Sequence, residues 1–226
     1  MAGAEQPLPR PAAAGTGPDH ETDPREERRR RRHEKTRREI LRAAREVLLE
    51  AGTDGLTVRD VAQRADFSPA ALYKYFSGRD EIIAALTIES FEILAGVIDA
   101  VPVRQRPDRR LVSLGLAYLK FAEENPADLR CILDATMRPL PASVDLSTGL
   151  RAVEALHETL LEGVRKGIFR DLSESELAGV AYGLWALVHG MTTLRGADLG
   201  TVRRVVRPDA RRALTIYVDG LRRPTS

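Results

Sequence analysis

The side chains best suited to catalysis are few in this 226-residue chain, and they lie far apart in its sequence. The four histidines stand at positions 20, 33, 157 and 189 and form no metal-ligand pair at helical spacing. We find no glycine-rich phosphate loop and no nucleophile elbow. The sequence therefore favours a protein that is not an enzyme, and it predicts neither catalytic residues nor a metal site.

Basic side chains, in contrast, are concentrated in one segment. Residues 25–45 hold eleven Lys or Arg and four Asp or Glu, so the segment carries +7 in a chain whose net charge is +2. Its centre is a run of five arginines: Arg28, Arg29, Arg30, Arg31 and Arg32. We expect a basic arm that follows a DNA backbone or enters a minor groove. The alternative is a disordered, solvated charge run that binds nothing.

Three helix start signals follow within 25 residues. Thr57 can cap a helix with Asp60 as its capping-box partner, and Ser68 can cap a second helix that has Pro69 at its first position. Ser77, with Asp80, predicts a third start. Two helices of about two turns, preceded by a longer one, form the layout of a helix-turn-helix, whose second helix enters the major groove.

The inner and outer faces of the second short helix can be separated by spacing. Leu72 and Phe76 are spaced to pack inward. Ala70 and Ala71 are small enough for a close approach to bases and thymine methyl groups. Asp66 lies in the turn between the helices, and it tolerates the left-handed backbone better than most residues.

The segment from Thr57 to Glu81 resembles the helix-turn-helix of the tetracycline-repressor (TetR) family. The resemblance rests on Thr57 to Ala62, on Phe67 to Phe76 with its Leu-Tyr-Lys-Tyr-Phe ending, and on Ser77 to Glu81. It implies that Tyr73, Tyr75 and Arg79 contact DNA phosphates and that Arg59 reads a base. The full predicted DNA-binding set is Thr57, Arg59, Ser68, Pro69, Ala70, Ala71, Tyr73, Lys74, Tyr75 and Arg79.

The sequence departs from the family pattern at two places. Asp66 stands in the turn where glycine is usual, and the start of the recognition helix lacks Gln, Asn and Arg. Hydrogen-bonded reading of bases therefore depends on Arg59 and Lys74.

The second half resembles a TetR subclass that has a Trp-x-x-x-His-Gly signature. Trp185 to Gly190 carries the signature, and Phe121 to Pro126 fits the end of an earlier helix. The resemblance implies a homodimer through the last two helices and a pocket for a small-molecule effector. We expect the pocket to be lined by Tyr118, Phe121, His157, Trp185 and His189. The alternative is that these histidines are hydrogen-bonded core residues, and Cys131 is expected to be a buried, inert thiol.

Helical periodicity continues along the rest of the chain, so the fold class is all-α. Apolar residues recur at helical spacing, and no convincing strand pattern interrupts them. The helix after the Ser173–Glu176 capping box is apolar nearly all round, which indicates a core on one side and a partner subunit on the other. We expect a disordered tail with the basic arm over residues 1–33, a three-helix DNA-binding domain over 34–81, and a helical bundle for effector binding and dimerisation over 82–226.

These features predict a transcriptional regulator, most simply a repressor that a small-molecule effector releases from a pseudo-palindromic double-stranded DNA operator. A single cysteine, no signal peptide and no apolar run of about 20 residues indicate a cytoplasmic protein that does not enter a membrane. We expect no cofactor. The alternatives are a helical interaction protein that does not bind DNA, and an enzyme that uses the C-terminal pocket.

Overall fold

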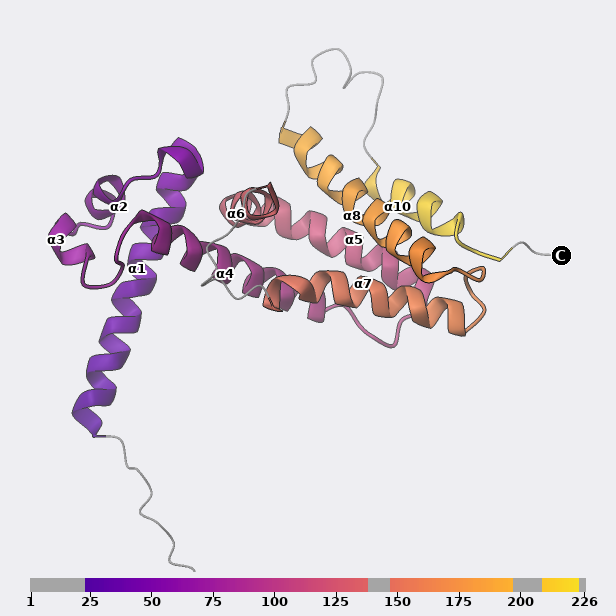
Figure 1. Ribbon diagram of the computed structural model, residues 1–226, viewed down its shortest axis with the longest axis horizontal. Coiled ribbons are helices and arrows are strands. Elements are labelled where there is room, and N and C mark those ends of the chain that lie inside the picture. The colour runs from indigo at the N-terminus through magenta and orange to yellow at the C-terminus, as the bar shows by residue number, and fades with distance from the viewer. Residues whose placement is uncertain (1–22, 138–146, 197–208, 224–226) are drawn as a thin grey trace, which may run out of the picture. The chain divides into compact units, whose positions relative to one another are not determined.

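The computed structural model describes residues 23–137, 147–196 and 209–223. The regular elements in this part of the chain are all helices, joined by loops, with one isolated bridge between Phe169 and Arg222 (Figure 1). The all-α prediction is confirmed. The helices are α1 (Pro24–Gly55), α2 (Val58–Arg64), α3 (Pro69–Leu72), α4 (Arg79–Asp99), α5 (Pro107–Glu124), α6 (Pro126–Met137), α7 (Ser147–Arg165), α8 (Glu174–Gly196) and α10 (Ala210–Asp219).

Contacts divide the chain after Thr36, and the described part of the first unit is one helical segment. The expectation that the arginine run belongs to a disordered tail is wrong, since α1 begins at Pro24. Two ion pairs at i, i+4 spacing, Arg31–Glu27 at 2.5 Å and Arg30–Glu34 at 3.7 Å, offset the repulsion between arginines. Residues 1–22, also expected to be disordered, lie outside the described residues.

The second unit contains two hydrophobic cores, and the first holds the short helices together. Gly52 ends the regular part of α1 with φ +75°, a conformation that glycine adopts at low cost. Apolar side chains of α1, α2, α3 and α4 then converge, and α6 adds two small residues to them. The buried members are Ile40, Leu41, Ala44, Val47, Leu48, Leu56, Val61, Ala62, Leu72, Phe76, Ile82, Ala85, Leu86, Ala127 and Cys131.

The second core lies in a bundle formed by the later helices. α4 packs against α6 and α7, and α5 packs against α7, α8 and α10. Phe121, Phe169 and Leu160 are its most deeply buried large side chains. Gly163 allows the ring of Phe169 to lie directly on α7, because a Cβ at this glycine would overlap the ring.

The helix α8 begins where the sequence predicts. Ser173 Oγ accepts a hydrogen bond from the Glu176 amide at 3.3 Å, and the Glu176 carboxylate accepts one from the Ser173 amide at 2.9 Å. The Ser173 amide and Arg170 together lower the pKa of Glu176 to about 2. By length and composition, the stretch Glu174–Leu194 is the one described helix that could cross a membrane, a test that core helices of water-soluble proteins also pass.

Candidate nucleic-acid interface

The first short helix, α2, is fixed by the predicted cap. The Thr57 hydroxyl accepts a hydrogen bond from the Asp60 amide at 3.1 Å and donates one to the Asp60 carboxylate at 2.6 Å. Val61 and Ala62 are fully buried, whereas Arg59 is exposed. The cap and the buried pair therefore hold α2 so that its arginine points to solvent.

The turn between α2 and α3 uses the backbone conformation that the sequence allows. Asp66 has φ +60°, and it is the one non-glycine residue with positive φ in the described segments. The following amide, that of Phe67, donates to Ala62 O at 2.8 Å and so ends α2. The departure from glycine is thus accommodated, because Asp adopts this conformation at a smaller cost than most residues.

The second short helix, α3, is shorter than predicted. Ser68 caps it through a 3.1 Å hydrogen bond from the Ala71 amide, and Pro69 occupies its first position, as expected. Only Pro69–Leu72 is α-helical, instead of two turns. Tighter bonds between residues three apart, Lys74 N to Ala71 O and Tyr75 N to Leu72 O, then carry the chain to Phe76. Leu72 and Phe76 are buried, which anchors this short element to the core.

The remaining side chains of α3 and its extension form the outer surface. Ser68, Pro69, Ala70, Tyr73 and Lys74 are exposed, and the Tyr73 residue is 56% accessible. This arrangement places most of the predicted DNA-binding set on one short, outward-facing stretch of chain.

Two residues at the edge of this surface are held more firmly. Ala71 and Tyr75 are half-buried. The Tyr75 ring packs edge-on against Phe67, with ring centroids 6.4 Å apart. Arg37 of α1 stacks its guanidinium 4.6 Å from the centre of the Phe76 ring, a contact that sequence spacing does not reveal.

The structure gives Arg79 internal partners. Its Nε donates to Leu56 O at 3.0 Å and a terminal nitrogen donates to Thr53 O at 2.6 Å, while the other pairs with Asp80 at 3.1 Å. The guanidinium therefore satisfies carbonyl groups at the end of α1. The family resemblance, in contrast, implies a phosphate contact for this residue.

The predicted third helix start is displaced by one residue. Gly78 is the N-cap of α4 and makes no side-chain cap, and the Ser77 amide donates to the carboxylate of Glu81 at 2.6 Å, not to Asp80. This bond lowers the pKa of Glu81. Glu81, one residue further along, is thus the reciprocal partner, because its longer side chain reaches back past Gly78.

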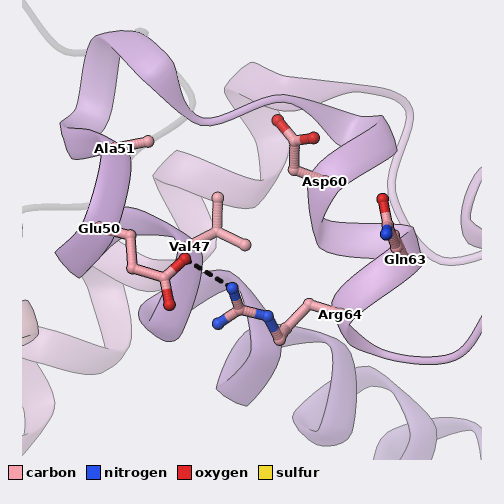
Figure 2. A pocket seen from close by; sticks show the side chains of 6 residues that line it. All are labelled: Val47, Glu50, Ala51, Asp60, Gln63 and Arg64. Carbon is pink, nitrogen blue, oxygen red and sulfur yellow. Dashed lines mark hydrogen bonds and ion pairs between the residues drawn. The ribbon is translucent and has the colours of Figure 1, made fainter.

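A shallow, open depression lies between α1 and α2, and Figure 2 shows its lining residues. Glu50 and Arg64 face each other across it at 2.6 Å. Asp60 and Gln63 complete the polar rim. Because its walls are charged and open to solvent, this depression does not suit an apolar effector.

The predicted effector residues come together in part. Tyr118 of α5 and His189 of α8 are hydrogen-bonded through Oη and Nε2 at 3.0 Å, and His189 Nδ1 lies 3.0 Å from Trp185 O. Because a carbonyl only accepts, Nδ1 carries the proton and Nε2 accepts from the Tyr118 hydroxyl. Burial lowers the pKa of His189 and raises that of Tyr118. Phe121 packs near Tyr118, with centroids 6.3 Å apart.

His157, predicted for the same pocket, is different. Its side chain is exposed on α7, and no described contact joins it to Tyr118, Trp185 or His189.

Cys131 lies in the first core and is 3% exposed, and burial raises the pKa of its thiol to about 11. It is therefore the inert thiol that the sequence predicts.

Sequence reasoning missed a buried polar network between α1, α4 and α6. Arg45 pairs with Asp128 at 3.0 Å and with Glu89 at 2.9 Å. The buried Ser90 hydroxyl, meanwhile, donates to Asp128 at 2.8 Å. The partners are 38 to 83 positions apart, so no local pattern indicates the network. It ties α6 to the helices of the first core.

Comparison with known proteins covers both halves of the chain. Residues 40–86 match the family model described as bacterial regulatory proteins, tetR family, and residues 111–220 match the one described as tetracyclin repressor-like, C-terminal domain. The HTH-type transcriptional regulator Rv1816 of Mycobacterium tuberculosis is 26% identical over 152 residues. That match spans 63% of this chain and 63% of the relative's length.

Solved structures share the fold along most of the chain. The TetR family regulator PfmR of Thermus thermophilus has 24% identity and a TM-score of 0.63, covering 83% of this chain and 95% of that one. AibR, solved with isovaleryl coenzyme A and operator DNA, has 16% identity and a TM-score of 0.65, covering 84% of this chain and 100% of that one.

Proposed function

We propose that the chain is a DNA-binding transcriptional regulator of the tetR family, because residues 40–86 match the model of that family and residues 111–220 match a tetracyclin repressor-like C-terminal domain. Its simplest form is a repressor that leaves a pseudo-palindromic operator when a small-molecule effector binds. The observation that carries the proposal is the exposed surface formed by α3 and the residues that follow it. Leu72 and Phe76 are buried in the first core and anchor this stretch, while Tyr73 and Lys74 face solvent. Such a rigid, outward-facing element fits a major groove.

The DNA contacts divide into positioning and reading. Tyr73, Tyr75 and Lys74 would hold phosphates, with Thr57 and Ser68 at the helix starts beside them. Arg59 and Lys74 would read base edges, and the small side chains of Pro69, Ala70 and Ala71 would let α3 lie close to the groove floor. Arg79 would add a phosphate contact by exchanging its exposed partner Asp80 for it, and it could keep both carbonyl partners.

A homodimer through α8 and α10 would provide two such heads. Tyr182 and Leu194 of α8 and Ile216 of α10 are between 55% and 68% exposed, so both helices carry exposed apolar side chains that a second copy of the chain could cover. Two-fold symmetry would then match the two half-sites of an operator.

The effector would bind beside Tyr118, Trp185 and His189, and the segment Trp185 to Gly190 would place the chain in the Trp-x-x-x-His-Gly subclass. Both ring nitrogens of His189 are engaged by Tyr118 and the Trp185 carbonyl, so an effector would contact its ring face or displace the Tyr118 hydroxyl; the Trp185 ring centroid lies 4.2 Å from that of His189. Because AibR binds isovaleryl coenzyme A, acyl coenzyme A compounds are a sensible first set of effectors to test. An effector acts only by binding the released state better than the DNA-bound one.

The proposed organisation keeps the sequence boundaries: a basic segment up to residue 33, a DNA-binding domain over 34–81, and an effector and dimerisation domain over 82–226. The protein would work in the cytoplasm, without a membrane and without catalysis. Among the described residues no group of three metal-ligating side chains forms.

The test is a fluorescence anisotropy titration against duplexes that the full-length protein selects from a random library. Lys74→Ala should weaken binding and flatten its salt dependence by about 0.9 in log–log slope for each phosphate that the variant no longer neutralises. The matched control is Lys120→Ala, an equally exposed lysine on α5 that pairs with Glu124, and it should leave the slope unchanged. If no sequence is enriched, the chain is better described as a helical interaction protein. If a sequence is enriched but Lys74→Ala binds it like the wild type, the contact assigned to Lys74 is wrong.

A further inference from the structure

The first turns of α1 carry two kinds of arginine. Arg30 and Arg31 are engaged with acidic residues one turn away, Glu34 and Glu27. Arg28, Arg29 and Arg32 are exposed, and within the part of the chain that the structure describes they have no acidic partner. The basic run is therefore not uniform, although its sequence is.

The arginines whose side chains form no ion pair with the described residues share one face, and Arg25, whose backbone amide donates to Asp23, is among them. Positions 25, 28, 29 and 32 follow the i, i+3, i+4, i+7 spacing of one helix face and fall within a sector of about 100°. Glu27 and Glu34 fall on roughly the opposite side of the same segment, and Glu26 lies outside the sector, about 60° from Arg29. The segment thus presents an acid-free arginine row, formed by Arg25, Arg28, Arg29 and Arg32, about 10 Å long at the 1.5 Å rise of a helix.

We propose that this arginine row binds the phosphate backbone of the DNA held by α3, as a second contact surface of the same protein. The inference rests on the proposed function. Duplex DNA presents about one negative charge per 1.7 Å of its axis, so a 10 Å row of guanidinium groups faces several phosphates. Arginine suits this contact because its planar fork donates two parallel hydrogen bonds to phosphate oxygens.

Two features of the segment favour DNA over a lipid surface. A helix that lies in a membrane interface needs an apolar face, and positions 24–36 contain no Leu, Ile, Val, Phe or Trp. The segment is also continuous with α1, whose later residues build the first core beneath α3. DNA bound by α3 is therefore present at a high effective concentration for the tethered arginines.

The experiment compares two full-length double variants that remove the same charge. Arg28→Gln with Arg32→Gln removes two members of the row, and Arg30→Gln with Arg31→Gln removes the two arginines that are paired to glutamates. Glutamine keeps a similar helix propensity, and far-UV circular dichroism checks that helix content is equal. Affinity for the selected duplex and for a random duplex of equal length is measured from 50 to 300 mM salt.

The row variant should lower the magnitude of the log–log salt slope by about 0.9 for each phosphate left without its arginine, on both duplexes. The paired-arginine variant should change it by less than half as much. Equal slopes for the two variants would overturn the proposal. So would a row variant whose binding is weakened only towards vesicles of phosphatidylcholine and phosphatidylglycerol.

The experiment distinguishes failure of the arginine row from failure of the proposed function. If the library yields a sequence that Lys74→Ala no longer binds while both arginine variants behave alike, only the arginine row is refuted. If no sequence is enriched, the proposed regulator fails, and slopes on the random duplex still decide whether the row binds phosphates.

Discussion

Asp128 should be among the most costly polar residues to remove, because it closes the buried network that ties α6 to α1 and α4. Its side chain is 8% exposed and accepts hydrogen bonds from Arg45 and Ser90. A hydrogen bond to a charged partner contributes about 1.5–3 kcal/mol, and the serine bond about 1 kcal/mol. Arg45 keeps Glu89 after the change, and its 21% exposure allows partial rehydration. We therefore expect Asp128→Ala to cost about 3 kcal/mol.

The assay is urea and thermal unfolding at pH 7 and one protein concentration, since a dimer's stability depends on concentration. For a chain of this size, 3 kcal/mol corresponds to a fall in Tm of about 6–12 °C. The control is Glu50→Ala, which breaks the Arg64 pair seen in Figure 2. That pair is 65% and 35% exposed, and exposed pairs contribute about 0–1 kcal/mol.

A double-mutant cycle tests whether Asp128 and Arg45 stabilise the protein as a pair. Arg45→Met alone leaves Asp128 buried without its cation, so the combined variant should cost clearly less than the sum of the two single changes. If Asp128→Ala costs less than about 1 kcal/mol, or if the two changes simply add, the network does not stabilise the junction as argued.

Three further outcomes follow from packing and protonation. Gly163→Ala should cost about 1–3 kcal/mol in chemical unfolding because its Cβ overlaps Phe169. Gly96→Ala, which has open space around it in α4, should instead add about 0.5–1 kcal/mol. The lowered pKa of His189 means that the unfolded chain binds more protons below pH 6.5. Stability should therefore be complete above that pH and fall as the pH drops through the folded-state pKa, and His189→Gln should remove this component of the pH profile. Cys131, with a pKa of about 11, should react with a disulfide reagent at pH 8 only after unfolding in urea.

Local signals in the sequence were sufficient for the helix starts. Thr57 and Ser68 cap as predicted because a cap depends on residues within one turn. The start at Ser77 is displaced because Glu81, with one methylene more than Asp80, reaches the Ser77 amide. Errors of this kind are small, since competing partners lie only one position apart.

Roles that depend on distant partners could not be predicted. Arg79 finds carbonyl groups 23 and 26 positions away, whereas the family resemblance implied only a phosphate contact for it. His157 and His189 both lie in apolar stripes, yet only His189 is turned towards α5. Which stripe faces the bundle interior depends on how the whole helix is rotated and packed against its neighbours. The residues near either histidine do not determine that packing.

The shortness of α3 restricts how the proposed DNA-binding surface can recognise bases. Its exposed start holds Ser68, Pro69 and Ala70, none of which has a long polar side chain, so close approach is favoured over hydrogen-bonded reading there. In the proposed set of DNA contacts, the longer donors are Lys74, just after α3, and Arg59 on α2. Base discrimination should then depend on two helices at once, joined by a turn in which Asp66 holds a left-handed backbone. Because this turn sets the angle between α2 and α3, its geometry would control specificity as directly as either donor does.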